Sequence, residues 1–427
     1  MPSWDVVVAG GGPAGSVCAA RLAARRRRVV VLERDHHPRF HLGESLLPGS
    51  LGVLDQLGVL DEVRRTFQCK RGARFVDGAG RDASVRYAFA EAFHAKWDHA
   101  FQVPRDAFDA LLFRRAGEIG AELREGWEVT RVLREAPGRA GAPAEADAGT
   151  GPGRAVGVEA RDAGGQVHAI DARFVVDATG RDAVVARAAR DVARIPQLDR
   201  TALFVQVRGA WRDTGEREGD LQLIVSGDGA DCTWLWLIPF ADGRASTGAC
   251  VSSAWIRARR EAHPTPEALL RQAWREAPAA QAMLADAELL FPPGATSDFS
   301  FRVGSLRGDG WLAIGDAGGF LDPLFSTGAH LAMVGALRAA DVIDAALDDG
   351  DVSAARFAPW EATMRAGTDF FLGAVQAFYA GELAPLLFAE PQRPFLRRAI
   401  TSLLAGDVFE PDARWAGEVR ARFPVRA

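Results

Sequence analysis

The N-terminal segment alternates apolar runs with polar breaks in the order strand, helix, strand. Asp5–Ala9 has the pattern of a short buried strand, and Pro13–Arg25 has a helical period. Val29–Leu32 is a second apolar strand, which ends at Glu33. This order predicts a βαβ unit at the start of the chain.

Alternating segments further along are typical of strands. Three of them predict a meander: Val129–Leu133, Ala155–Arg161 and His168–Val176. Between the first two, Ala136–Arg154 is rich in Ala, Gly and Pro and is predicted to be a loop. Four more segments predict a second, antiparallel sheet: Ala202–Val207, Leu221–Val225, Thr233–Pro239 and Ala245–Val251.

Helical periods dominate the rest of the chain. Ala107–Gly117 is predicted to be a helix, and Trp311–Ile314 a buried strand followed by a helix from about Ala329. From about Ala354 to the end the tail is mostly helical by its period. The nucleotide-binding part of the chain is therefore expected to be assembled from separated segments, with the second sheet inserted between them.

The first strand and helix are joined by a phosphate-binding type of turn, Gly10-Gly11-Gly12-Pro13-Ala14-Gly15. In this GxGxxG pattern the glycines allow a tight turn and a close approach of the backbone to a pyrophosphate, while helix N–H groups hold the anion. An acid at the end of the second strand can accept from a ribose hydroxyl. The predicted dinucleotide contacts are Gly10, Gly12, Pro13, Ala14, Gly15 and Glu33.

Three further segments favour FAD over a nicotinamide cofactor. Gly315-Asp316 follows a strand, and its aspartate can accept hydrogen bonds from ribityl hydroxyls. Asp177-Ala178-Thr179-Gly180 resembles the ATG segment of FAD-dependent oxidoreductases, and Arg105 resembles the arginine before a helix that meets the flavin in that group. Because no second fingerprint is found, NAD(P)H is not expected to have a Rossmann site of its own.

These patterns predict an α/β protein, with an interrupted Rossmann-type FAD-binding domain, an inserted antiparallel-sheet substrate domain and a helical C-terminal part. The expected FAD-binding domain is discontinuous and comprises 1–68, 100–185 and 296–345. The substrate-side sheet domain comprises 69–99 and 186–295, and the C-terminal helical part 346–427.

Composition and charge limit the cellular location and the binding partners that we expect for the protein. A formal charge of −5 over 427 residues gives no reason to expect nucleic acid or an anionic membrane as a partner. Four scattered cysteines predict a reducing cytoplasm and no metal site. The early first strand leaves no room for a signal peptide, and no apolar run is long enough to span a bilayer. Only Lys70 and Lys96, among 51 basic residues, are lysines.

Two motifs resemble those of the flavin-dependent halogenases. Trp234-Leu235-Trp236-Leu237-Ile238-Pro239 fits the family's WxWxIP motif, and Phe320–Gly328 fits FxxPxxSxG. The resemblance extends from the N-terminus to Leu403–Val408. On a strand the two tryptophans share one face, and the resemblance implies that they keep organic substrate away from the flavin. In the second motif, Ser326 or Thr327 can cap the following helix and leave free N–H groups for a small anion.

The resemblance also implies a set of catalytic roles. Lys70 aligns with the family's essential lysine, and Ser326 is placed with it in the catalytic group; the backbone amides of Thr327 and Gly328 bind chloride or bromide. FADH2 from a separate flavin reductase reacts with O2 to give a flavin hydroperoxide, which halide converts to hypohalous acid. A lysine can hydrogen-bond that acid or carry halogen as a haloamine, whereas arginine cannot easily do either. The loop Arg39–Ser45, with its Gly-Glu-Ser, resembles the one that reaches the flavin.

One position departs from the tryptophan halogenases. They carry a glutamate before Ser-Thr-Gly, where this chain has Phe325, which we group with Trp234 and Trp236 as gating the substrate. The pattern is closer to the phenol and pyrrole branch, some members of which act on acyl groups tethered to an acyl carrier protein. The expected function is halogenation of a phenolic or pyrrolic ring.

Two alternatives stay open. One is a class A aromatic hydroxylase that NAD(P)H reduces in place, although those enzymes usually carry a DG-type segment where this chain has Asp177–Gly180. The other is a halogenase-like flavoprotein without halide chemistry, such as a reductase of isoprenoid double bonds or a non-catalytic scaffold.

Overall fold

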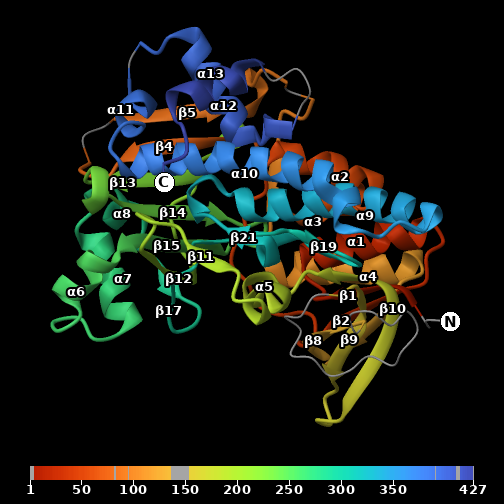
Figure 1. Cartoon of the computed structure of the whole chain (residues 1–427). Helices are drawn as coiled ribbons and strands as arrows, with labels where there is room; N and C mark the ends of the chain where they lie inside the picture. Colours follow the sequence, from red (N-terminus) through yellow and green to blue (C-terminus); the bar gives the residue numbers. More distant parts are fainter. Residues whose placement is uncertain are drawn as a thin grey trace.

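The computed structural model describes residues 4–80, 83–94, 96–135, 153–389, 391–409 and 414–426, so nearly all of the predicted loop Ala136–Arg154 lies outside the described residues. Two large sheets lie at opposite ends of the molecule, and long helices run across the space between them (Figure 1). The expected fold class is confirmed.

The first sheet is mainly parallel. Its central order is β20 (Trp311–Ala313), β10 (Val167–Asp177), β1 (Trp4–Ala9), β2 (Val29–Glu33) and β7 (Glu122–Glu125), all paired in parallel. Antiparallel strands extend it: β19 (Arg307–Gly308), β9 (Ala155–Arg161) and β8 (Glu128–Arg134). The predicted βαβ unit and meander are confirmed.

Both faces of this sheet are covered, which explains its uninterrupted apolar runs. Val6 and Val8 pack toward helices on one face, and Val7 and Ala9 pack toward β8 and β9 on the other. The helices on the first face are α1 (Pro13–Ala24), α4 (Arg105–Ile119) and α9 (Thr327–Asp349). The short α5 (Val184–Ala188) lies on the opposite face.

The second sheet is the predicted antiparallel one. Its order is β16 (Glu288–Leu289), β12 (Arg200–Arg208), β15 (Ala245–Ser252), β14 (Thr233–Pro239), β13 (Leu221–Ser226), β4 (Gly72–Asp77) and β5 (Ser84–Ala88), with β17 (Gly294–Ser297) also on β12. One pair, β13 with β4, is parallel, and its two strands lie far apart along the chain. The domain boundaries given above stay a prediction.

Alternation divides the second sheet into two apolar faces. Leu235 and Leu237 pack under α6 (Ser253–Arg259), α7 (Pro266–Arg275) and α8 (Pro278–Met283). Trp234 and Trp236 point to the other face and enter the large core that also holds side chains of α1 and α9. The tryptophans therefore share the face that looks into the molecule, as the motif predicts.

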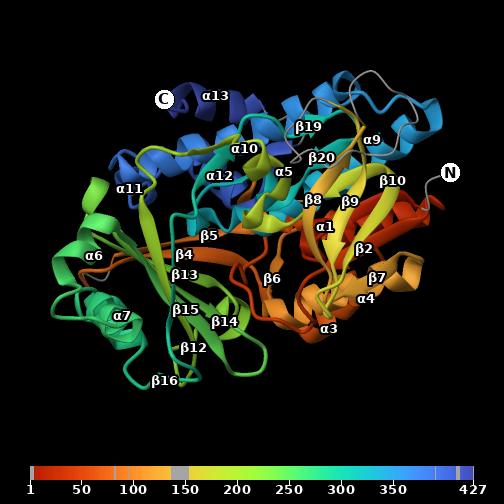
Figure 2. The same ribbon diagram turned by 60° about the horizontal axis from the view of Figure 1, so that its bottom comes forward.

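The C-terminal part is helical, as expected. It consists of α10 (Ala358–Tyr379), α11 (Ala384–Leu387), α12 (Pro394–Ala405) and α13 (Arg414–Arg422). In two views α10 runs across the molecule (Figures 1 and 2), while α12 contacts β5 and α13 contacts α10 and α12. Small elements complete the chain: α2 (Leu51–Gln56), α3 (Leu60–Thr66), β3 (Gln68–Lys70), β6 (Ala100–Gln102), β11 (Val192–Arg194), β18 (Phe301–Val303) and β21 (Gly319–Phe320).

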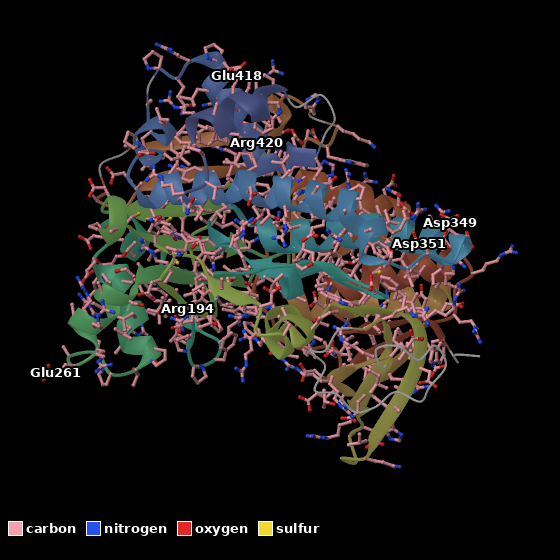
Figure 3. The ribbon with its side chains drawn as sticks, viewed as in Figure 1. Arg194, Glu261, Asp349, Asp351, Glu418 and Arg420 are labelled. Carbon is pink, nitrogen blue, oxygen red and sulfur yellow. The ribbon has the colours of Figure 1, made fainter. Side chains whose placement is uncertain are left out.

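Charged side chains of both signs are spread over the outside. Arg194, Glu261, Asp349 and Arg420 project from separate parts of the periphery (Figure 3). Among the described residues no helix is long and apolar enough to cross a membrane.

A substitution at Gly248 of β15 tests how tightly the sheet face that carries Trp234 and Trp236 is packed. A Cβ there would lie 2.2 Å from the Leu203 carbonyl oxygen and 2.3 Å from the Trp236 ring. Gly248→Ala should therefore lower the free energy of unfolding by about 2–3 kcal/mol in urea denaturation. Gly417→Ala, in α13 with nothing within 4 Å of the added carbon, is the matched control and should be neutral or slightly stabilising. Equal unfolding midpoints for the two variants would contradict this packing.

Candidate functional site

The glycine-rich turn lies between β1 and α1, and two of its glycines are required by close backbone contacts. Gly10 has φ +101°, and a Cβ on it would lie 2.3 Å from the Ala178 carbonyl oxygen. A Cβ on Gly15 would lie 1.9 Å from the Gly10 oxygen. At Gly12 an added Cβ would meet only an Arg39 guanidinium nitrogen at 3.5 Å, so this side of the turn is open to a ligand. Gly12 also caps α1 without a side-chain hydrogen bond, which leaves helix amides for an anion.

Glu33 and Arg39 border the same turn. Glu33 accepts from the Gly11 amide at 2.7 Å and from the Asp35 amide at 2.9 Å. The Arg39 guanidinium is 3.6 Å from the Glu33 carboxylate and 3.3 Å from that of Asp109. Its buried Nε has no hydrogen-bond partner within the described chain. The turn therefore combines free amides, an acid and a cation that is paired with carboxylates but keeps one nitrogen without a hydrogen bond, a set of groups that suits a pyrophosphate and a ribose.

Arg105 is the first residue of α4 and holds the loop that follows Arg39. Its Nε and Nη2 donate to the two oxygens of Asp109 at 2.7 and 3.0 Å, and its Nη1 donates to the Leu42 carbonyl at 2.5 Å. The side chain is 6 % exposed, which excludes an ordinary surface cation. Gly43, with φ +95°, lies against the same guanidinium, and a Cβ there would be 3.0 Å from Nη1.

Glu44 connects this loop to the second sheet. It is buried, accepts from the Gln206 amide at 2.8 Å and hydrogen-bonds to Ser246. Burial raises the pKa of Glu44 to about 7, although both hydrogen bonds lower it. Ser246 also accepts from the Trp236 indole N–H at 3.2 Å, so the loop is tied to the tryptophan motif through one hydroxyl.

Lys70 ends β3 and is 1 % exposed. Its Nζ donates to Ser45 Oγ at 2.9 Å and to the Leu46 carbonyl at 3.1 Å, and lies 5.0 Å from the centre of the Phe89 ring. Burial lowers the pKa of Lys70 to about 7, and the Asp220 charge offsets only part of that effect. Cys69, its neighbour on the strand, is more exposed, as strand alternation predicts.

The two tryptophans lie together, with ring centroids 5.7 Å apart, and both indole N–H groups have partners. Trp234 donates to the Tyr379 hydroxyl at 2.8 Å. Tyr379 in turn donates to Asp322 at 3.0 Å, within the Phe320–Gly328 segment. Burial raises the pKa of Asp322 to about 6. The two tryptophans thus form an apolar surface. Their indole N–H groups connect it to the loop that carries Glu44 and to the turn that carries Asp322.

The Phe320–Gly328 segment ends at the start of α9, which begins at Thr327, two residues earlier than the sequence suggested. Thr327 is the first helical residue, and Ser326 stands at the cap position in the left-handed region, with φ +55°. The predicted hydroxyl cap is wrong, because Ser326 in this conformation makes no side-chain hydrogen bond to the helix and Thr327 lies inside it. The first amides of a 23-residue helix therefore keep no side-chain partner from the cap. Phe325 is 1 % exposed, inside the large core.

Asp316 lies in the turn after β20, and within the described chain its carboxylate accepts no hydrogen bond. Burial raises the pKa of Asp316 to about 6, against the charges of Arg105 and Arg181. A hydrogen-bond acceptor in this position suits a hydroxyl-bearing ligand. Gly315, Asp316, Phe320, Thr327 and Gly328 line one pocket with side chains of α9 and α10.

Lys70 donates a hydrogen bond directly to Ser45. Arg39 and Arg105 both form ion pairs with Asp109. Lys70 hydrogen-bonds to the loop and not to the start of α9. Sequence reasoning missed Tyr379, and it named Asp109, Asp322 and Glu44 only as parts of motifs. Tyr379 had one weak signal, since the chain has only two tyrosines. In the described ranges, no three His, Cys, Asp or Glu side chains are grouped as metal ligands.

The chain is similar to known proteins over most of its length. A family model described as tryptophan halogenase matches residues 5–103 and 91–382. A brominase of 1H-pyrrole-2-carbonyl-peptidyl-carrier protein from Pseudoalteromonas luteoviolacea is 28 % identical over 419 residues, 96 % of this chain and 93 % of the relative. A chlorinase of the same kind of substrate from Pseudomonas fluorescens is 28 % identical over 436 residues, 95 % of this chain and 90 % of the relative.

Solved structures resemble the whole chain. A flavin-dependent brominase superimposes with a TM-score of 0.84 at 25 % identity, covering 98 % of both chains. The myxobacterial chondrochloren halogenase, described as a variant of FAD-dependent halogenases, has a TM-score of 0.78 at 29 % identity and covers 99 % of this chain and 97 % of its own.

The buried amine of Lys70 predicts a particular dependence of stability on pH. Its pKa is lower in the folded protein than the ordinary value of 10.5, so the unfolded chain binds more protons between pH 7 and 10. The free energy of unfolding should therefore rise with pH in this window, by about 3 kcal/mol relative to a Lys70→Met variant. Urea denaturation at several pH values measures the difference. Lys96→Met, at the exposed lysine, should follow the wild-type curve; parallel curves for wild type and Lys70→Met would show that the amine is not desolvated.

Proposed function

Because the chain belongs to the tryptophan halogenase family of flavin-dependent halogenases, we propose that it halogenates an electron-rich phenol or pyrrole with FADH2 supplied by a separate flavin reductase. The observation that carries the proposal is the Lys70 amine, which is buried against Ser45 and Leu46. A buried amine with a pKa of about 7 is partly neutral at physiological pH and can react with an electrophile.

Three features fit FAD. They are the open side of the glycine turn, the Arg39 Nε that has no hydrogen bond, and the Asp316 carboxylate that accepts no hydrogen bond in the described chain. Reduced FAD bound here supplies the two electrons that activate O2 and thereby allow halide to be oxidised to hypohalous acid. The residues proposed to hold it are Gly10, Gly12, Pro13, Ala14, Gly15, Glu33, Arg39, Ser45, Arg105 and Asp316. The NADH that feeds the reductase needs no site on this chain.

We propose that the halide, chloride or bromide, binds at the start of α9. The amides of Thr327 and Gly328 lie at the positive end of a long helix dipole, and Ser326 turns the chain there without occupying them. Ser326 is proposed to act in the catalytic centre through its left-handed backbone conformation, which turns the chain at the start of α9. Its hydroxyl makes no capping bond that competes with an anion.

Lys70 is the residue proposed to act on the oxidised halogen. The neutral amine can take Cl⁺ from HOCl, which gives a chloramine and releases hydroxide that becomes water on protonation. Transfer of Cl⁺ to the ring then restores the amine after the ring loses a proton. Alternatively, the ammonium form can hydrogen-bond the hypohalous acid and direct it. The first role requires an amine that can lose its proton, and the second requires a compact donor; a guanidinium keeps its proton and spreads its donors over a planar fork.

The substrate class is inferred from the surroundings of the halide segment. Trp234 and Trp236 form an apolar surface, and Phe325 lies where the tryptophan halogenases have a carboxylate. Nothing at this position can accept a proton from an indole, whereas a phenol or pyrrole is activated by its own heteroatom. Two relatives act on pyrrole carried by a peptidyl-carrier protein, which supports the same delivery here.

A reductase-coupled assay tests the proposal. With FAD, NADH, O2, chloride or bromide and an added flavin reductase, the protein should halogenate a pyrrole-2-carbonyl thioester on a carrier protein, or a phenol. Free tryptophan should give negligible product, because no carboxylate stands at Phe325. Mass spectrometry measures both. Efficient chlorination of free tryptophan would contradict the proposed substrate class. Substrate-stimulated NADPH oxidation without a reductase would instead indicate a hydroxylase.

Substitution of the two lysines tests the role of Lys70. Lys70→Arg keeps a charge but cannot form a haloamine, so product formation should fall by at least about 100-fold while FAD affinity changes little. Lys96→Arg is the matched control at an exposed site and should leave product formation unchanged. The yield of halogenated product per FADH2 measures the effect. A near-normal yield from Lys70→Arg would remove the lysine from the mechanism.

A further inference from the structure

Tyr379 connects the tryptophan strand to the segment that precedes α9. Its hydroxyl accepts from the Trp234 indole N–H at 2.8 Å and donates to the Asp322 carboxylate at 3.0 Å. The other Asp322 oxygen accepts from the Leu324 amide at 2.9 Å. Tyr379, Trp234 and Asp322 are each at most 5 % exposed. These bonds form one continuous chain from β14, through the last residue of α10, to the turn before α9.

The turn that this chain holds is strained. The Pro323–Phe325 turn closes with a bond from the Ser326 amide to the Pro323 carbonyl, and Ser326 itself has a left-handed φ of +55°. A non-glycine residue in this region persists only where its surroundings impose the conformation. Asp322 begins the turn, so the direction of its carboxylate decides where the turn starts, and Tyr379 is the hydroxyl that fixes one of its two oxygens.

The tyrosine ring is itself held in place. The Arg200 guanidinium lies 3.9 Å from the ring centroid and donates to the carbonyls of Cys232 and Ala230 at 2.7 and 3.1 Å. A cation over an aromatic face adds to the packing that fixes the ring plane. The hydroxyl is therefore presented to Asp322 from a rigid platform on the second sheet.

We propose that Tyr379 is a positioning residue, which acts through Asp322 to hold the Pro323–Ser326 turn so that the Thr327 and Gly328 amides converge on halide. This inference rests on the halide site of the proposed function. Without the hydroxyl, one Asp322 oxygen and the Trp234 N–H lose their buried partner, and the turn is free to relax. The amides would then meet halide with poorer geometry, while the FAD contacts at the glycine turn between β1 and α1 would stay intact.

Tyr379→Phe tests the proposal, with Tyr87→Phe as the matched control. Tyr87 is the other tyrosine; it is also buried and donates its hydroxyl to the Leu387 carbonyl at 2.7 Å, remote in sequence from the turn. Each variant loses one hydrogen bond that the hydroxyl donates and one that it accepts, because Tyr379 accepts from Trp234 and Tyr87 accepts from the Gln392 amide at 2.5 Å. Tyr379→Phe should raise the KM for chloride by about tenfold, change kcat much less and divert FADH2 to hydrogen peroxide, with FAD affinity unchanged. Tyr87→Phe should keep the wild-type halide KM.

Asp322→Asn provides a second variant if Tyr379→Phe does not fold. The asparagine oxygen can still accept from the Leu324 amide, but the side chain no longer offers two acceptors, so the halide KM should rise again. Direct titration of the FAD-loaded variants with bromide, followed by the flavin absorbance, measures halide binding without turnover. Unchanged halide binding and KM in both variants, or an equal rise in Tyr87→Phe, would overturn the positioning role while the wild type still halogenates. A wild-type protein that neither binds bromide nor forms product would overturn the proposed function itself.

Discussion

The burial of polar groups in the loop Arg39–Leu46 is the constraint on which the site depends. A charged or polar group taken out of water is costly unless it is paired, and this loop carries several. Its partners lie on different elements: Asp109 on α4 for Arg39, Gln206 on β12 for Glu44, and Lys70 on β3 for Ser45. Since none of these bonds can be broken cheaply, the loop sets the distance between the dinucleotide fold and the second sheet.

The tryptophan pair extends this constraint to the start of α9. Trp236 reaches the loop through Ser246 and Glu44, and Trp234 reaches the Asp322 turn through Tyr379. Hydrogen bonds at both indole edges fix the two rings, whose planes are inclined to each other by 47°. The two residues proposed as a barrier between substrate and flavin therefore also link the loop Arg39–Leu46 to the turn before α9.

Periodicity predicted most of the fold because it reflects burial within single elements. The runs at Val6–Val8 and Val29–Val31 lie in a sheet covered on both faces, and alternation at Trp234–Leu237 correctly placed both tryptophans on one face. The predicted start of α9 was late, since Ser326 adopts a left-handed conformation that residue preferences disfavour. The role of Lys70 came from a resemblance and from its rarity among arginines, not from any pattern in its three-residue strand.

The sequence by itself determined the βαβ opening, the glycine turn, the inward tryptophans and the helical tail, because these follow from dihedral preferences and from burial repeated every two or 3.6 residues. Only the tertiary structure decided that Glu44 meets Gln206, that Trp234 meets Tyr379 and that Tyr379 meets Asp322. These partners are 162, 145 and 57 residues apart along the chain. A hydrogen bond between single side chains at such separations leaves no periodic trace, and it exists only after hydrophobic burial has brought the elements together.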